Sequence, residues 1–277
     1  MRFGFVVPNN FGVEDPREVV RLGVLAEQLG FDSVWVNHHV LNVGYVKDRL
    51  GVAPYHDALV TLTWLAAETQ SVRLGTSVLV MPYLHPMVLA KELATLDQLS
   101  GGRLEVGLGV GSLPEENAAL GVPYEGRGAY SNEFIQVLRA LWADGPASHA
   151  GDHFQFTDLI TSPKPRQRPG VPIMVGGNRP VALRRAARLG DGWHPLGVSP
   201  EGLARRLEVL RAEARAAGRD HVPTAVQVRL DINGVSANTI AQYAEAGATE
   251  LVLSINSGDV AEQEAQLRAF AQQAILS

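Results

Sequence analysis

No cysteine occurs among the 277 residues of this sequence. Its absence excludes disulfide bonds, metal sites built on thiolates and catalysis by a cysteine nucleophile. Charged residues are also scarce, at 19% of the chain, and the formal net charge is −5. This charge gives no reason to expect nucleic acid or an anionic membrane as a partner.

Long apolar runs are lacking as well. The sequence has no stretch of about 18 apolar residues, the length that a membrane-spanning helix needs. The opening residues, MRFGFVVPNN, hold too short an apolar run for a secretory signal peptide. Hydrophobic residues nevertheless make up 46% of the chain, enough to bury a large core. These features predict a soluble, globular protein of the cytoplasm.

One local pattern recurs along the chain: the end of a helix, a glycine, a short connection and a strand. It appears in LAEQLGFDSVWV, AARLGDGWHP and YAEAGATELVL. Gly30, Gly190 and Gly247 occupy the position at which the C-terminus of a helix favours a left-handed residue. A helix–strand unit that recurs in this way is typical of a protein with alternating strands and helices.

Short runs of β-branched and apolar residues predict eight strands, separated by helical stretches with a 3.6-residue apolar period. The length suits one (β/α)8 TIM barrel, an α/β fold, and no linker divides it, so we predict a single domain of residues 1–277. The expected strands are Phe3–Val7, Ser33–Val36, Arg73–Leu79, Leu104–Leu108, Ile173–Val175, Gly192–His194, Ala225–Leu230 and Glu250–Leu253.

The stretch 143–172 interrupts this alternation. It is rich in glycine and proline, lacks helical periodicity and ends in SPKPRQRPGVP. Its length exceeds what a connection between a helix and a strand needs. We expect an extended loop region before the fifth strand that covers one end of the barrel.

Polar or glycine-rich residues gather where the predicted strands end. In a barrel of this type the carboxyl ends of the strands carry the chemistry. The stretches concerned are Pro8–Asn10, Asn37–His39, Thr76–Ser77, GLGVGS, GGNR and the HP at the end of the sixth strand. Their clustering predicts a functional site at this end of the barrel.

Two glycine motifs could bring the backbone close to a ligand. GLGVGS, residues 107–112, has the spacing that permits close approach to a phosphate or a flat ring. Ser112 stands at its third glycine position, so it is not a dinucleotide fingerprint. VGGN, residues 175–178, leads into a helix beginning near Pro180, whose free N–H groups could hold an anion. Both motifs are equally compatible with plain glycine turns.

His38 and His39 follow the second predicted strand, and two interpretations are open. Either they form hydrogen bonds within the core, or one of them exchanges protons with a substrate. A metal pair is not expected, because adjacent strand residues point to opposite sides and few carboxylates lie nearby in sequence. The chain also lacks the G-x-S-x-G motif of serine hydrolases.

Together these stretches resemble the bacterial luciferase-like monooxygenase family, in particular its branch that uses the 8-hydroxy-5-deazaflavin coenzyme F420. GFDSVWVNHH resembles the family's second-strand motif. RLGTSVLVMPYLHPMVLAKELATLDQLSGGRLEVGLGVG resembles the third and fourth strands with the helix between them. PKPRQRPGVPIMVGGNRPVALRRAARLGDGWHP resembles the fifth and sixth strands. The resemblance covers nearly the whole chain.

The resemblance implies a barrel with a long flat cofactor, coenzyme F420 or alternatively FMN, at its open end. It aligns His39 with the family's active-site histidine, and His38 with a position where the family has Asp or Glu. It also implies a cis peptide bond between Ser77 and Val78. The residues that match cofactor-binding segments are Ser77 and Val78 under the ring, Gly109, Gly111 and Ser112 near the cofactor tail, and Gly176, Gly177 and Asn178 on the phosphate side.

We therefore expect an oxidoreductase that transfers a hydride between F420 and a small organic substrate, with His39 exchanging a proton. An FMN-dependent monooxygenase that receives reduced flavin from a flavin reductase is the second hypothesis. A non-catalytic flavin-binding protein is the third. Tyr45, Tyr55 and His56 are the candidates to line the substrate pocket. Formation of a homodimer is compatible with these features.

Overall fold

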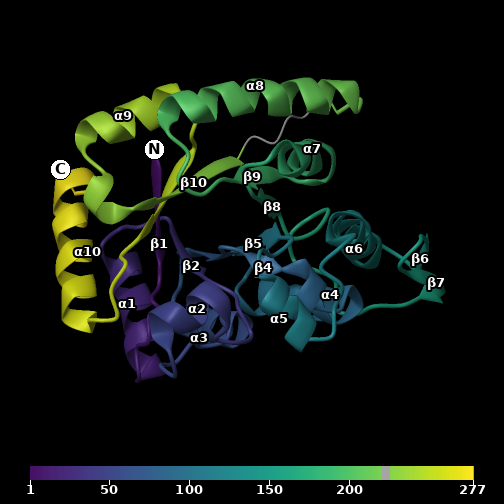
Figure 1. Cartoon of the computed structure of the whole chain (residues 1–277), viewed down its shortest axis with the longest axis horizontal. Helices are drawn as coiled ribbons and strands as arrows, with labels where there is room; N and C mark the ends of the chain where they lie inside the picture. The colour runs from purple at the N-terminus through teal and green to yellow at the C-terminus, as the bar shows by residue number, and fades with distance from the viewer. Residues whose placement is uncertain (220–224, 277) are drawn as a thin grey trace.

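The computed structural model, which describes residues 1–219 and 225–276, contains a closed barrel of eight parallel strands (Figure 1). The first strand pairs with the last one, and the third pairs with the next barrel strand, which closes the ring. This confirms the (β/α)8 barrel. The barrel strands are β1 (Arg2–Val6), β2 (Ser33–Val36), β3 (Arg73–Thr76), β5 (Leu104–Gly109), β8 (Ile173–Gly176), β9 (Gly192–His194), β10 (Ala225–Asp231) and β11 (Glu250–Ser254).

Helices connect the strands and surround the barrel. Asp15 shows how one of them starts: its carboxylate accepts a hydrogen bond from the Arg17 backbone N–H, and Pro16 has a φ suited to the first turn. The helices are α1 (Pro16–Gln28), α2 (Gly44–Leu50), α3 (Ala58–Glu68), α4 (Pro86–Leu99), α5 (Pro114–Ala119), α6 (Arg127–Trp142), α7 (Pro180–Leu189), α8 (Pro200–Ala216), α9 (Ala237–Glu245) and α10 (Val260–Ala274), with short 3₁₀ helices at Met81–Tyr83 and Ile232–Gly234. None of the helices within the described ranges is long and apolar enough to cross a membrane.

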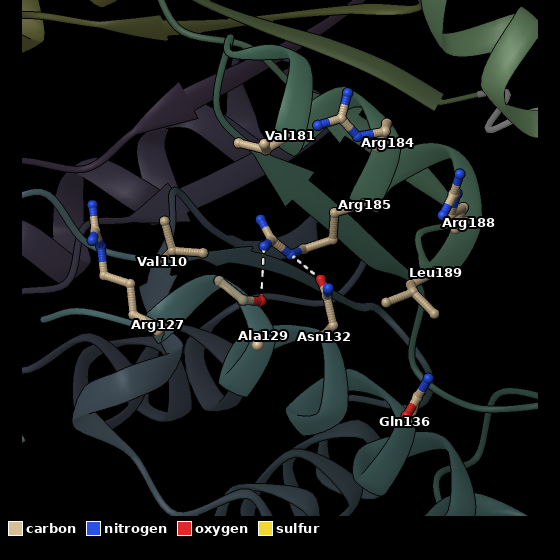
Figure 2. A pocket seen from close by; sticks show the side chains of 12 residues that line it. Val110, Arg127, Ala129, Asn132, Gln136, Val181, Arg184, Arg185, Arg188 and Leu189 are labelled. Carbon is tan, nitrogen blue, oxygen red and sulfur yellow. Dashed lines mark hydrogen bonds between the residues drawn. The ribbon is translucent and has the colours of Figure 1, made fainter. Parts of the chain in front are cut away.

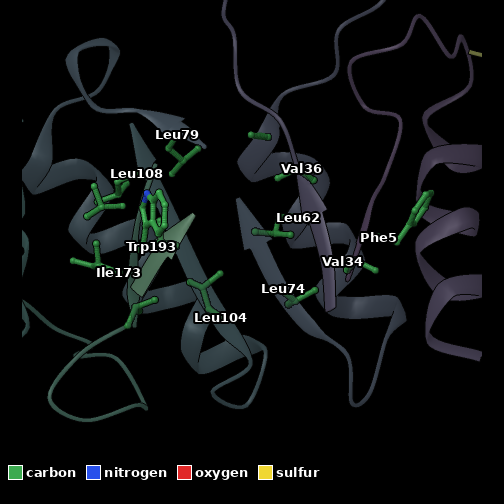
Figure 3. Close-up of a cluster of buried hydrophobic side chains, with 14 of the residues drawn as sticks. Phe5, Val34, Val36, Leu62, Leu74, Leu79, Leu104, Leu108, Ile173 and Trp193 are labelled. Atoms are coloured by element: carbon green, nitrogen blue, oxygen red, sulfur yellow. The ribbon is translucent and has the colours of Figure 1, made fainter. Parts of the chain in front are cut away.

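The main core lies between the strands and the surrounding helices (Figure 3). Val34, Leu74, Leu104 and Ile173 come from four neighbouring strands and are fully buried. Burying a side chain of this size stabilises the fold by about 1.5–3 kcal/mol. The apolar side chains of the strands therefore pack against those of the surrounding helices, and this packing holds the barrel together.

A polar network fills part of the barrel interior. Arg73 on β3 forms ion pairs with Glu105 on β5 and with Glu250 on β11, the latter at 2.9 Å. The Gln227 amide on β10 donates to both carboxylates. Because these strands lie on different sides of the ring, their side chains meet inside it. The buried carboxylates are thus compensated by a guanidinium and an amide.

The third predicted strand, Arg73–Leu79, is interrupted. β3 ends at Thr76, the Ser77–Val78 peptide bond is cis as expected, and the chain pairs again with β5 through β4 (Leu79–Val80). Glycines on neighbouring strands make room for this bulge. A Cβ at Gly109 would lie 2.5 Å from Val78 Cγ2, and one at Gly176 would lie 3.0 Å from Val78 Cγ1. Larger residues at these positions would collide with Val78.

Two of the three helix-ending glycines adopt the expected conformation. Gly30 and Gly247 have φ values of +86° and +101°. The expectation for Gly190 was wrong, because its φ is −86° and its backbone is extended. Space explains this glycine instead: a Cβ there would lie 3.0 Å from the carbonyl oxygens of Ala186 and Gly192.

The stretch 143–172 is more ordered than a loop and lies elsewhere than expected. It contains an antiparallel hairpin of β6 (Ala147–Ala150) and β7 (Gln155–Leu159). The Glu133 carboxylate on α6 accepts hydrogen bonds from the backbone N–H groups of His153 and Phe154. The hairpin therefore packs beside α6, at the periphery of the molecule in Figure 1, and does not cover an end of the barrel.

Candidate active site at the carboxyl ends of the strands

His39, just beyond β2, is held from both sides of its ring. Its Nδ1 lies 2.6 Å from Glu116 Oε2, and its Nε2 lies 2.9 Å from the Tyr45 hydroxyl. The His39 side chain is 14% exposed, whereas that of Glu116 is fully buried. A buried carboxylate at Nδ1 fixes the orientation of the imidazole and leaves Nε2 directed toward the more exposed side.

Glu116 on α5 is a site residue that the sequence motifs did not reveal. Its other oxygen accepts hydrogen bonds from the backbone N–H groups of Val40 and Leu41, at 2.7 and 3.1 Å. Burial alone would raise its pKa, but the hydrogen bonds from His39 and these two N–H groups outweigh burial and lower the pKa. Glu116 is therefore an anion that ties α5 to the loop carrying His39.

His38 faces a different environment from its neighbour. It is 6% exposed, and its Nδ1 accepts a hydrogen bond from the backbone N–H of Val80 at 3.1 Å. Burial lowers the pKa of His38 to about 4, so the ring is neutral at physiological pH. The ring thus supports β4, the strand that follows the Ser77–Val78 bulge.

The bulge and the strands opposite it share a network of polar side chains. Ser77 Oγ lies 2.8 Å from His194 Nε2, and Arg229 on β10 donates to the carbonyl and hydroxyl oxygens of Ser77 at 3.2 Å. Arg229 also donates to Asn37 Oδ1. Burial, reinforced by the charge of Arg229, lowers the pKa of His194 to about 3. These side chains form a connected floor beneath the carboxyl ends of the strands.

Two of the three proposed substrate-pocket residues lie beside His39. Tyr45 contacts it through the hydrogen bond described above, and the Tyr55 ring packs edge-on against it at 5.9 Å between centroids. The Tyr55 hydroxyl is buried and has no partner within residues 1–219 and 225–276. His56 points elsewhere, because its Nε2 lies 2.7 Å from the carbonyl oxygen of Val13.

The residues matched to cofactor-binding segments fall into three groups. Ser77 and Val78 form the bulge itself. Gly109 and Gly176 pack against Val78 and thereby shape the bulge, as described above. The others lie in loops after β5 and β8, where Gly111 and Gly177 have positive φ and the Asn178 amide donates to the Leu196 carbonyl at 2.7 Å. Ser112 is exposed; burial raises the pKa of Tyr45, and Ser112 acts in the opposite direction.

A cavity of about 620 Å³ opens between α6 and α7 (Figure 2). Arg127, Arg184, Arg185 and Arg188 line it, and no acidic side chain of the described residues is among its lining. Arg185 is buried and donates to Asn132 Oδ1 at 2.7 Å and to the carbonyl of Gly128 at 3.0 Å, the two dashed lines in Figure 2. Such a cavity suits an anionic group. Its lining includes Val110 in the loop after β5 but neither member of the His39–Glu116 pair.

The chain is similar to several known proteins. The family described as luciferase-like monooxygenase matches residues 1–274. The FMNH(2)-dependent dimethylsulfone monooxygenase of Pseudomonas putida is 32% identical over 238 residues, which cover 85% of this chain and 61% of that protein. The F420-dependent glucose-6-phosphate dehydrogenase of Amycolatopsis mediterranei is 35% identical over 182 residues, which cover 64% of this chain and 53% of that protein.

A solved structure extends the likeness to the fold. The F420-dependent secondary alcohol dehydrogenase in complex with an F420-acetone adduct superposes with a TM-score of 0.82 at 20% identity, covering 98% of this chain and 97% of that one. The chain thus spans less than two thirds of the two sequence relatives but matches this structure over nearly its full length. With its barrel, its bulge after β3 and the match over residues 1–274, the chain belongs to the luciferase-like monooxygenase family.

Proposed function

We propose that this chain is an oxidoreductase that binds coenzyme F420 at the carboxyl ends of its strands and moves a hydride between F420 and a small organic substrate. The observation that carries the proposal is His39, fixed by the Glu116 anion next to Tyr45 at the end of β2. The F420-dependent names of several relatives support the choice of cofactor.

The residues around the barrel's carboxyl end fit a flat, polar ring. Tyr55 Oη, His194 Nδ1 and Arg229 Nε are buried and lack hydrogen-bond partners in the described part of the chain. Leaving a buried polar atom without a hydrogen-bond partner costs free energy. A ligand that supplies the missing partners would therefore bind more favourably. When bound, the deazaflavin supplies the ring carbon that accepts or releases the hydride.

His39 would provide the proton chemistry. Its Nε2 can take a proton from a substrate hydroxyl, or return it to a carbonyl oxygen, while the Glu116 anion at Nδ1 stabilises the positive charge on the ring. Tyr45, on the Nε2 side, can orient the same oxygen. His38, neutral and bonded to Val80, would keep β4 and the bulge in place and take no part in proton transfer.

The arginine-lined cavity supports a cofactor with a phosphate-bearing tail. Both F420 and FMN carry such a group. Arg127 and Arg184 line the cavity without a carboxylate partner in the described chain, so a phosphate there would meet uncompensated positive charge. The backbone N–H groups of the Gly176–Asn178 loop, before the start of α7, would add donors on the same side.

An FMN-dependent monooxygenase is the second candidate. It is favoured by the dimethylsulfone monooxygenase relative, whose alignment covers 85% of this chain. In that case a separate flavin reductase would deliver the reduced flavin. A cytoplasmic location and a homodimer belong to the proposal in either case. A flavin-binding protein without turnover is the third candidate, since His38 replaces the acid of the family motif.

Titration of the purified chain with F420, FMN and NADPH tests the proposal. We expect dissociation constants on the order of micromolar or tighter for F420, and weaker binding of FMN. Tighter binding of NADPH than of F420 would contradict it. His39→Ala is the matched control, because it should keep cofactor affinity within a few-fold while removing the proton exchange.

A further inference from the structure

Arg229 on β10 is a partly buried cation whose hydrogen bonds all go to neutral groups. Its Nη1 donates to Asn37 Oδ1 and to the two oxygens of Ser77. Its Nε is buried without a partner, and no carboxylate of residues 1–219 and 225–276 forms an ion pair with it. Elsewhere in the barrel interior, the guanidinium of Arg73 is paired with two carboxylates. Arg229 therefore lacks the compensation that the same fold gives to another interior arginine.

The electrostatic surroundings of Arg229 add no negative charge. Tyr55, Arg49 and Tyr45 act on its pKa, and none of them is a carboxylate. Burial lowers the pKa of Arg229 to about 10, which still leaves it protonated at neutral pH. A desolvated cation without an anion is costly, and such a group is retained where a ligand supplies the opposite charge.

The neighbours of Arg229 indicate which ligand could supply this charge. It bonds to Ser77 at the bulge and to Asn37, the residue before His38 and His39. It also acts on both Tyr55 and His194, the two other side chains of this region with unpartnered buried atoms. The cation therefore lies in the floor of the proposed ring site, and it is not among the residues that line the arginine cavity between α6 and α7.

With a cofactor ring bound here as proposed, hydride transfer to it would place a negative charge next to Arg229. A hydride consists of one proton and two electrons, so its transfer would add one unit of negative charge to a ring that has not yet taken up a further proton. On the basis of the proposed function, we propose that Arg229 is the fixed positive charge that stabilises the reduced cofactor ring. A neutral donor would suffice to hold Ser77 and Asn37 together, whereas a positive charge would in addition stabilise a negatively charged ring.

The test compares affinities for the two redox states. Wild type, Arg229→Gln, Arg229→Lys and the surface control Arg268→Gln are each titrated anaerobically with oxidised and reduced F420 and FMN by equilibrium ultrafiltration. Wild type should bind the reduced ring more tightly than the oxidised ring. Arg229→Gln should lose at least about tenfold more affinity for the reduced ring than for the oxidised one, which corresponds to a potential about 30 mV lower for a two-electron couple. Arg229→Lys should keep most of the preference, and Arg268→Gln should keep all of it.

Two results would overturn the inference while leaving the proposed function intact. One is equal loss of both redox states in Arg229→Gln, which would mean that the guanidinium only clamps the floor. The other is equal affinity of wild type for both states, which decides the matter even where the Gln variant does not fold. If wild type binds neither ring, the proposed function fails and this inference fails with it.

Discussion

At the residue scale, the proposed chemistry depends on a pair that spans 77 positions of sequence, His39 and Glu116. The carboxylate is fully buried and its remaining oxygen is occupied by two backbone donors. It therefore has little freedom to leave the imidazole. In such a pair, Nδ1 of the imidazole stays hydrogen-bonded to the carboxylate, and Nε2 is available for proton transfer.

We expect His39→Ala to lower turnover by about 10²–10⁴, because general acid–base assistance is of that size. Glu116→Gln keeps the shape of the side chain but removes the anion, and should lower turnover by about 10-fold or more. Single-turnover rates check both. Glu115→Gln is the control on the same helix, since Glu115 is exposed. Wild-type rates in Glu116→Gln would show that the carboxylate has no part in the reaction.

His38 makes the stability of the fold sensitive to acid. Burial lowers its pKa from 6.5 to about 4, so between these values the unfolded chain binds a proton that the folded chain does not. The contribution of neutral His38 to the free energy of unfolding is therefore fully present above pH 6.5 and is lost as the pH falls toward 4. The loss amounts to about 1.4 kcal/mol for each pH unit between the two pKa values. His194 acts in the same direction down to a pKa of about 3.

Replacing His38 by asparagine isolates its share. The Asn amide oxygen can still accept from Val80 but does not titrate. Urea unfolding of His38→Asn from pH 7 to 4 should show a shallower loss of stability than wild type, in which both histidines contribute. Parallel curves for the two proteins would mean that His38 is charged, or exposed, in the folded state.

At the scale of elements, the bulge between β3 and β4 depends on glycines that come from other strands. Gly109 on β5 and Gly176 on β8 leave space for the two methyl groups of Val78. This assigns to the GLGVGS and VGGN motifs a packing role alongside the ligand-binding role proposed for their loops. One glycine can fill both roles, because the absence of a side chain lets Val78 approach on one side and a ligand on the other.

Gly109→Ala should destabilise the fold by about 1–3 kcal/mol, the usual cost of overpacking a tight site. Its new methyl group would lie 2.5 Å from Val78 Cγ2. Val78→Ala in the same chain should recover part of the loss, which denaturant unfolding measures. Gly234→Ala is the control, since nothing lies within 4 Å of its added Cβ. An additive double mutant would argue against contact between residues 109 and 78.

At the scale of the whole molecule, the two ends of the chain meet in one sheet. β1 pairs with β11 from Arg2↔Glu250 to Val6↔Ser254, and α10 lies against α1 in Figure 1. Removing either end would therefore open the barrel. This arrangement is the physical basis for predicting that residues 1–277 unfold as one domain.

We expect a single cooperative transition, with far-UV circular dichroism and tryptophan fluorescence giving the same midpoint. The tryptophans suit this test, because Trp35, Trp142 and Trp193 are fully or almost fully buried on different elements. Two separated transitions, or midpoints that differ between the probes, would contradict the single-domain prediction.

The sequence by itself determined the alternation of strands and helices, the end of the barrel that carries the polar residues, and the family. These features follow from local preferences: β-branched runs, 3.6-residue periods, and side chains such as Ser199 that start a helix. The family motif also indicated His39 and the cis peptide after Ser77. All of this information lies within a few residues of the position concerned.

Only the tertiary structure decided which distant residues meet. Glu116 reaches His39, and Arg229 reaches Ser77 across 152 positions, because closing the ring brings the carboxyl ends of separate strands to one place. Packing between elements also leaves no room for a Cβ at Gly190. The 143–172 hairpin is held on α6 by the Glu133 carboxylate, a contact that sequence spacing does not reveal. Local backbone preferences act over a few residues, whereas these contacts depend on packing between elements that are far apart in the chain.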